Sequence, residues 1–253
     1  DSVIEFLRLL RKEIPLSQVK GLVYKDSSKI NKNEPHPLIS NLDRIPYPAR
    51  DLLSLNRYFD VFSRSPHFIT MITSRGCPYD CIFCDRENRM GHTWRAQSPR
   101  RVVEEIKECK SRYGIKEVMF FDDEFIIDKA RIYGLCELML LEGLKINWEC
   151  RARVDRIDER LLNIMRKAGC YRIRFGFESG NEGILKLFKK NITLEQSLNA
   201  VRLSRRAGLE IFGYFMIGSP EETPRTVEET IYFALRLGLD FSIFSKTSSM
   251  IAK

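Results

Sequence analysis

The sequence predicts an α/β fold whose core is a partial (βα)6 barrel of parallel strands, preceded by a short α+β segment and a proline-rich strap. From about position 67 onward, short apolar runs alternate with segments of helical periodicity. Each of these helical segments is followed by a glycine, at positions 114, 143, 169, 208 and 238. This alternation is typical of βαβ units, in which consecutive strands lie parallel in one sheet.

Length and composition exclude several other classes of protein. The chain has 253 residues, of which 43% are hydrophobic and 30% charged, as in an ordered globular protein. No apolar run approaches the roughly 18–20 residues that cross a bilayer. The seven cysteines do not resemble a secreted disulfide framework, so we expect a reducing cytoplasm. The chain starts at Asp1 without a methionine or a leader, and we expect a fragment.

The net charge of +8 has two interpretations. A basic chain can attract nucleic acid or an anionic substrate. Here the two signs are interspersed, as where Arg100 and Arg101 precede Glu104 and Glu105. We therefore favour a solvated surface and expect no nucleic-acid partner.

The first quarter of the chain differs from the rest. Apolar spacing predicts a short helix over 3–10, and two short strands at 21–24 and around Ile30 predict a hairpin. Five prolines then fall between positions 31 and 66, which indicates a linker or strap with one helical stretch near 51–59.

The barrel elements follow in order from position 67. Predicted strands occupy 68–72, 116–121, 146–150, 171–177, 211–217 and 240–244. Predicted helices begin at or just after Ser98, Asp128, Asp158 and Thr193, because these side chains can cap a first turn, and a further helix is predicted over 224–237. A complete eight-unit barrel takes about 250 residues, so 67–253 predicts an incomplete, TIM-like barrel. The tail 245–253 lacks an apolar period, and we expect truncation after the sixth strand.

Three cysteines directly after the first barrel strand carry the sharpest chemical signal. Cys77, Cys81 and Cys84 have the spacing C-x3-C-x2-C. Three thiolates are one too few for a closed zinc site, and His92 lies too far downstream to complete one. They can instead hold a four-iron four-sulfur (4Fe-4S) cluster with one iron left open. Loops after parallel strands are also where ligands bind in such folds.

This motif resembles that of the radical S-adenosylmethionine (SAM) superfamily, in which an aromatic residue, here Phe83, precedes the last cysteine. The resemblance implies that the three thiolates hold the cluster and that the amino and carboxyl groups of S-adenosylmethionine chelate the fourth iron. An electron from the cluster then cleaves the sulfonium to give methionine and a deoxyadenosyl radical.

Further blocks are similar to the cobalamin (B12)-binding subgroup, which includes magnesium-protoporphyrin cyclase and carbon and phosphorus methylases. They lie at positions 21–53, 74–78, 121–125, 176–180 and 216–220. The resemblance implies that 1–30 is the remnant of a cobalamin-binding domain, 31–66 a linker, and 67–253 the radical core. Two departures stand out. No Asp-x-His-x-x-Gly is present, and positions 220–223 read Pro-Glu-Glu-Thr instead of Pro-Gly-Glu-Thr.

The resemblance also implies a set of cofactor-binding residues at strand ends. They are Phe83 and Met216 near adenine, Asp122 and Asp123 at the amino group, Arg153 at the carboxylate, and Glu178 and Ser179 at the ribose or the amino acid moiety. Each has a plainer structural alternative: a solvated strand end for the aspartates, a helix-capping turn for Glu178 and Ser179, a surface ion pair for Arg153, and core packing for Met216. The remaining cysteines, 109, 136, 150 and 170, are predicted to be small core residues.

The leading hypothesis is a radical SAM enzyme acting on a small molecule by methyl transfer or oxidative cyclisation. It would use a flavodoxin- or ferredoxin-type electron donor, and cobalamin in the full-length protein. One alternative is a non-catalytic iron–sulfur or metal-binding module. Another is an RNA-modifying radical SAM enzyme, although residues 1–66 lack the second cysteine set of such enzymes.

Overall fold

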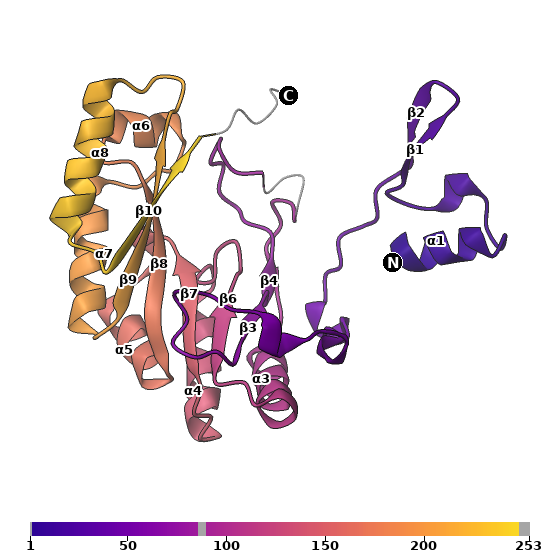
Figure 1. Ribbon diagram of the computed structural model, residues 1–253, viewed down its shortest axis with the longest axis horizontal. Helices are drawn as coiled ribbons and strands as arrows, with labels where there is room; N and C mark the ends of the chain where they lie inside the picture. The colour runs from indigo at the N-terminus through magenta and orange to yellow at the C-terminus, as the bar shows by residue number, and fades with distance from the viewer. Residues whose placement is uncertain (1, 86–89, 248–253) are drawn as a thin grey trace. The chain divides into compact units, whose positions relative to one another are not determined.

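The computed structural model describes residues 2–85 and 90–247, which belong to two compact units, Asp1–Ser40 and Asn41–Lys253 (Figure 1). Each unit is described by itself. Within the described residues, no helix combines the length and apolar character needed to cross a membrane.

The smaller unit contains the helix and hairpin that the sequence predicts. Helix α1 spans Ser2–Leu10, and a short 3-10 helix, η1, spans Leu16–Gln18. Strands β1 (Val23–Asp26) and β2 (Lys29–Lys32) pair antiparallel around a turn at Ser27. The assignment of this segment to a cobalamin-binding domain stays a prediction.

The larger unit is built on a six-stranded parallel sheet that curls into a half-barrel (Figure 1). The strands are β3 (Phe68–Met71), β6 (Glu117–Phe120), β7 (Asn147–Ala152), β8 (Cys170–Glu178), β9 (Glu210–Ile217) and β10 (Phe241–Lys246). Their order in the sheet is β10-β9-β8-β7-β6-β3, with every neighbouring pair parallel. The predicted partial (βα)6 fold is therefore confirmed.

The helices of this unit cover the outer face of the sheet (Figure 1). They are α3 (Pro99–Tyr113), α4 (Lys129–Leu141), α5 (Glu159–Lys167), α6 (Glu182–Leu187), α7 (Leu194–Arg206) and α8 (Pro224–Leu237), with the 3-10 helix η5 (Val154–Arg156) before α5. The four predicted caps are present, because each of these side chains accepts a hydrogen bond from a backbone N–H of its first turn. Thr223, which was not predicted as a cap, does the same for α8.

Three short features differ from the prediction. The strap holds 3-10 helices η2 (Leu42–Arg44), η3 (Arg50–Leu52) and η4 (Leu55–Arg57) where one helix near 51–59 was expected. Helix α6 and the two-stranded ribbon of β4 (Ser74–Arg75) and β5 (Arg95–Ala96) were not predicted from the sequence. All are six residues or shorter, too short for a periodic pattern to register.

The two faces of the sheet bury different kinds of side chain. On the outer face, Phe120, Trp148 and Phe175 pack with the helices, and the four cysteines predicted to be core residues are buried. On the inner face, the Glu149 carboxylate pairs with Arg172 at 3.1 Å and with Arg174 at 2.6 Å. A network of charged side chains therefore fills part of the lumen, where closed barrels stack branched aliphatic residues.

Candidate active site

The cysteine loop leaves the short ribbon through a glycine. Gly76 has φ of +85°, and a Cβ at this position would overlap the carbonyl oxygen of Thr93. The next residue, Cys77, donates its backbone N–H to the carbonyl of Gly91 at 3.2 Å. Glycine is therefore needed here, both for its left-handed conformation and for the close approach of the two backbone segments.

The second half of the loop rests on the segment that follows α6. Ile82 donates its N–H to the carbonyl of Phe188 at 3.1 Å, and the rings of Phe83 and Phe188 meet edge to face with centroids 5.1 Å apart. The sulfur of Cys81 lies 3.9 Å from the carbonyl oxygen of Lys189. The loop is thus held at both ends, which fixes where its thiols lie.

A cavity of about 390 Å³ opens between this loop and the carboxyl ends of β6 to β9. It brings the three motif cysteines together with five of the predicted cofactor residues. These are Phe83, Asp123, Arg153, Glu178 and Met216.

Two predicted residues lie outside this lining. The Asp122 carboxylate is fully buried and accepts hydrogen bonds from the Thr73 N–H and hydroxyl, each at 3.0 Å, and from the Ser74 hydroxyl at 2.5 Å. Ser179 is also fully buried, where its hydroxyl lies 3.1 Å from Thr230 Oγ1 and accepts from the Asn181 N–H. Ser179 thus holds the turn before α6, whose N-cap is Asn181, and Asp122 ties the first two strand ends together.

Arg153 lines the cavity, but its guanidinium already has partners. Nε donates to Asp155 at 2.9 Å and Nη2 to the carbonyl of Lys190 at 2.7 Å, while the group stacks on the Tyr79 ring at 3.8 Å. Arg153 is therefore fixed in the cavity wall by three partners.

Glu178 and Lys190 form a buried ion pair, with 2.9 Å between Oε1 and Nζ. Glu178 has φ of +65°, unusual for a residue with a side chain, and this conformation turns its carboxylate back toward the cavity. Gly176 makes room for the pair, because a Cβ there would collide with the Glu178 carboxylate and come within 2.8 Å of Lys190 Nζ.

Four further charged residues line the cavity: Arg151, Arg174, Glu124 and Lys190. Burial raises the pKa of Glu124 to about 7, although its carboxylate accepts the Ile126 N–H. Glu124 had a detectable signal, because it completes a run of three acidic residues at a strand end. Lys190 had none, since it lies between α6 and α7, outside any pattern.

Burial favours the neutral form of two of the thiols. It raises the pKa of Cys77 to about 11. It also raises the pKa of Cys81, where the charges of Lys190 and Arg153 act in the opposite direction. Thiolate ligands in such a site form when a metal displaces their protons.

The donor set fits a cluster better than a single ion. Within residues 2–85 and 90–247, no three Cys, His, Asp or Glu side chains converge on one point that could hold an ion. A four-iron cluster makes a different demand, because each thiolate binds a separate iron. The described lining offers three thiols and no histidine, which matches a cluster with one open iron.

A parallel half-barrel with three thiols beside a cavity at its carboxyl edge defines an α/β-barrel protein with a soft-donor cofactor site. Residues 71–234 match the Radical SAM superfamily, and the chain belongs to that superfamily.

Two relatives carry names that bear on function. The chain is 39% identical over 241 residues to the uncharacterized methyltransferase PH0819 of Pyrococcus horikoshii, covering 95% of this chain and 52% of that protein. It is 31% identical over 222 residues to the anaerobic magnesium-protoporphyrin IX monomethyl ester cyclase of Cereibacter sphaeroides, covering 86% of this chain and 36% of that protein. The chain thus spans about half the length of these relatives, or less.

A solved structure gives the same fold. The cobalamin-dependent S-adenosylmethionine radical enzyme OxsB, with aqua-cobalamin and S-adenosylmethionine bound, superposes with a TM-score of 0.77 at 24% identity. The match covers 92% of this chain and 34% of that one.

Proposed function

We propose that this chain is the catalytic core of a radical S-adenosylmethionine enzyme that holds a 4Fe-4S cluster through Cys77, Cys81 and Cys84. The single observation that carries the proposal is that these thiols, 77 to 84 on one loop, line one cavity at the carboxyl ends of the strands. When bound, the cluster supplies one electron to S-adenosylmethionine, whose sulfonium–carbon bond breaks to give methionine and a deoxyadenosyl radical.

The side chains of the cavity suit the three parts of S-adenosylmethionine. The carboxylates of Asp123 and Glu124 face the same cavity as the thiols and can accept hydrogen bonds from its ammonium. Phe83 and Met216 offer the apolar contact that adenine needs. Glu178 supplies an acceptor for ribose hydroxyls.

We assign the cofactor's carboxylate to Arg151 in place of Arg153. The Arg153 guanidinium is bound to Asp155 and to the Lys190 carbonyl. Arg151 lines the same cavity, its buried Nε has no hydrogen-bond partner, and it pairs with no carboxylate in the described part of the chain. A planar guanidinium in this position can bind a carboxylate through two parallel hydrogen bonds.

The complete protein is proposed to use cobalamin for methyl transfer or oxidative cyclisation of a small molecule. The relatives named as methyltransferase and cyclase, and the fold shared with a cobalamin-dependent enzyme, support this reading. A flavodoxin- or ferredoxin-type donor is proposed to supply the electron.

Anaerobic reconstitution with iron and sulfide tests the proposal. We expect a broad charge-transfer absorbance, about four irons per chain, and release of 5′-deoxyadenosine when S-adenosylmethionine and a strong reductant are added. The triple variant C77A/C81A/C84A should lose all three signals. C136A, which removes a buried core thiol, should keep them.

Two outcomes would contradict the proposal. An unchanged absorbance spectrum in the triple variant would show that these thiols do not hold the cluster. A normal cluster without any 5′-deoxyadenosine release would instead favour the non-catalytic iron–sulfur module.

A further inference from the structure

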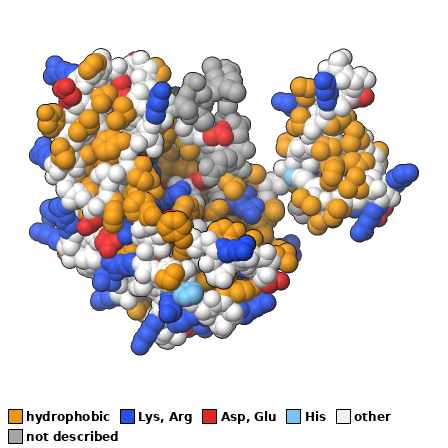
Figure 2. Space-filling view, viewed as in Figure 1, with side chains coloured by type: hydrophobic (Ala, Val, Ile, Leu, Met, Phe, Trp, Pro, Cys, Tyr) orange, Lys and Arg blue, Asp and Glu red, His pale blue; other side chains and the backbone are white. Residues whose placement is uncertain are grey.

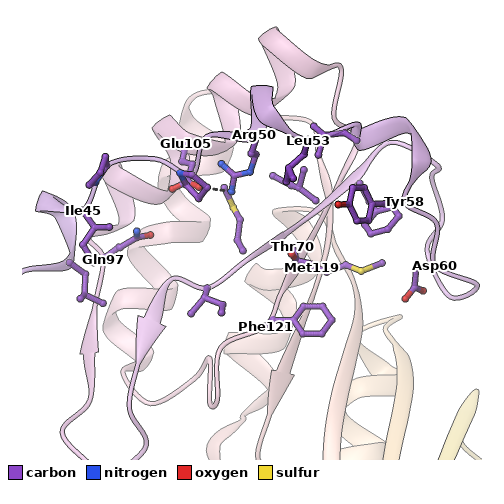
Figure 3. Close-up of a pocket in the computed structure, with 18 of the residues that line it drawn as sticks. Ile45, Arg50, Leu53, Tyr58, Asp60, Thr70, Gln97, Glu105, Met119 and Phe121 are labelled. Atoms are coloured by element: carbon purple, nitrogen blue, oxygen red, sulfur yellow. Dashed lines mark hydrogen bonds and ion pairs between the residues drawn. The ribbon is translucent and has the colours of Figure 1, made fainter. Parts of the chain in front are cut away.

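A second, larger cavity lies between the strap and the inner side of β3 and β6. Its volume is about 590 Å³, within the roughly 300–1,000 Å³ typical of small-molecule sites. Figure 3 shows Leu53 and Tyr58 of the strap on one side and Met119 and Phe121 on the other. All of these residues belong to the larger unit, so the cavity is formed within one compact body.

Most of this lining is apolar, and its deep charged pair is self-sufficient. Arg50 and Glu105, drawn with a dashed line in Figure 3, form a buried ion pair with 2.7 Å between Nη2 and Oε1. Because each neutralises the other, the pair does not call for a charged ligand. Leu53, Tyr58 and Ile72 remain more than half exposed at the cavity. Hydrophobic side chains also gather around the hollow of the larger unit in Figure 2.

Arg75 is the one basic lining residue without an ion-pair partner within residues 2–85 and 90–247. The Asp60 carboxylate, which also lines the cavity, accepts the Phe62 N–H. The Arg75 side chain is half-buried, and the described residues give it no hydrogen-bond or ion-pair partner. It stands directly opposite Arg95 in the β4–β5 ribbon, a like-charged pair that is unfavourable in an antiparallel ladder. Burial and the charge of Arg75 together lower the pKa of Arg95. An anion beside Arg75 would relieve this repulsion.

The apolar cavity adjoins the cluster cavity. Phe121 lines the first and Arg151 lines the second, and the Arg151 guanidinium lies over the Phe121 ring, 4.1 Å from its centroid. Arg75 also precedes the cysteine loop by a single residue. A molecule held in the apolar cavity would therefore lie next to the proposed radical chemistry.

We propose that this cavity is the substrate site and that it takes an amphipathic anion, a small molecule with an apolar body and a carboxylate or phosphate group. The apolar body packs between the strap and Met119 and Phe121. The anionic group pairs with Arg75. The identification as substrate site rests on the proposed function, whereas the binding of an amphipathic anion does not.

Two fluorescent probes with the same apolar body test the binding. One, 1-anilinonaphthalene-8-sulfonate, carries a sulfonate, and the other, N-phenyl-1-naphthylamine, is neutral. In the complete chain, R75Q should lower the affinity for the sulfonate probe by about tenfold or more. It should change the affinity for the neutral probe by less than about twofold. R75K should retain most of the sulfonate affinity. Arg57 is an exposed arginine on the same strap, and R57Q should alter the affinity for neither probe.

A second variant checks the place of binding. Thr70 lines the cavity beside Met119 in Figure 3. T70W places a large side chain there and should lower the affinity for both probes. The proposal is overturned if R75Q leaves sulfonate binding unchanged, or if it weakens both probes equally, which would indicate a plain apolar contact surface. Release of 5′-deoxyadenosine by the wild-type chain is measured separately. If the wild-type chain binds the probes but releases no 5′-deoxyadenosine, the proposed function is contradicted and the anion-binding site is not.

Discussion

Lys190 is a buried cation at the wall of the cluster cavity. Its Nζ lies 2.9 Å from Glu178 and 5.8 Å from the centroid of the Phe83 ring, and only 7% of the residue is exposed. Burial opposes its charge, but Glu178 and the Cys81 sulfur outweigh that effect, so the pKa of Lys190 is raised. The charged amine therefore holds Glu178 and faces the thiols at the same time.

Replacing Lys190 by methionine leaves the Glu178 carboxylate buried without its partner. We expect K190M to lower the free energy of unfolding by about 3 kcal/mol, measured by urea denaturation. K189M, at the exposed neighbouring lysine, should change it by less than about 0.5 kcal/mol. E178Q/K190M should recover part of the loss, and a double variant as unstable as K190M would argue against this pairing.

The direction of a side chain at a strand end was the part of the site least predictable from the sequence. Asp122 and Asp123 are adjacent and carry the same chemistry, yet Asp123 lines the cavity and Asp122 is bound to Thr73 and Ser74. Successive side chains at a strand end point in opposite directions, so one residue of register decides which carboxylate reaches the site. Arg151 and Arg153 pose the same problem, because both line the cavity and only their partners differ.

The short ribbon and its loop depend on Gly76. We expect G76A to reduce iron incorporation strongly on reconstitution, because the added Cβ meets the Thr93 carbonyl in a left-handed conformation that alanine disfavours. G134A is the matched control. In α4 its Cβ would meet only the Pro99 ring, at 3.6 Å, so stability should rise by about 0.5–1 kcal/mol with no loss of iron. Normal iron content in G76A would contradict this account of the loop.

Strand β9 is tied to the strap and to β8 through Glu210, whose carboxylate pairs with Arg64 and with Arg172 at 2.7 Å. Burial favours the neutral acid, but the hydrogen bonds from Arg64 and Arg172 outweigh it, so the pKa of Glu210 lies below its ordinary value of 4.5. A carboxyl whose pKa is lowered on folding stabilises the protein above its unfolded pKa and loses this effect as the pH falls through the folded pKa.

The substitution E210Q should therefore destabilise the protein by about 2 kcal/mol at pH 7. The difference in the free energy of unfolding between wild type and variant should become smaller as the pH falls below about 4.5. Urea titrations at several pH values would measure this difference. A gap that stays constant from pH 7 to pH 3 would exclude the ion pairs as its cause.

Regular elements were predictable because their signals are local. Ser98, Asp128, Asp158 and Thr193 cap helices where the sequence placed them, and the apolar runs became strands of one parallel sheet. The strap was predicted only as irregular chain. Its short turns depend on distant partners, such as Asp43 accepting the Ser98 N–H at 2.8 Å, which no local pattern encodes.

At the scale of the whole molecule, the sheet order followed from the βα alternation, but the content of the lumen did not. The lumen holds three charged residues from alternate positions of β7 and β8: Glu149, Arg172 and Arg174. In the sequence, such a pattern is typical of a strand face exposed to solvent. The curl of the sheet turns that face inward, where Glu149 pairs with both arginines and Glu210 supplies a second negative charge to Arg172. The apolar cavity under the strap was likewise invisible, because residues from positions 42 to 121 build it jointly.

The contact between Phe121 and Arg151 gives the two cavities a common wall. A guest that pushes the ring aside also shifts the guanidinium proposed to grip S-adenosylmethionine. Thermodynamic linkage then requires reciprocity: whatever factor S-adenosylmethionine imposes on the affinity of the sulfonate probe, the probe must impose on S-adenosylmethionine. Calorimetric titration of each ligand in the presence of the other would measure that factor, and F121L should bring it closer to one. A single aromatic side chain would then couple the binding of the two ligands.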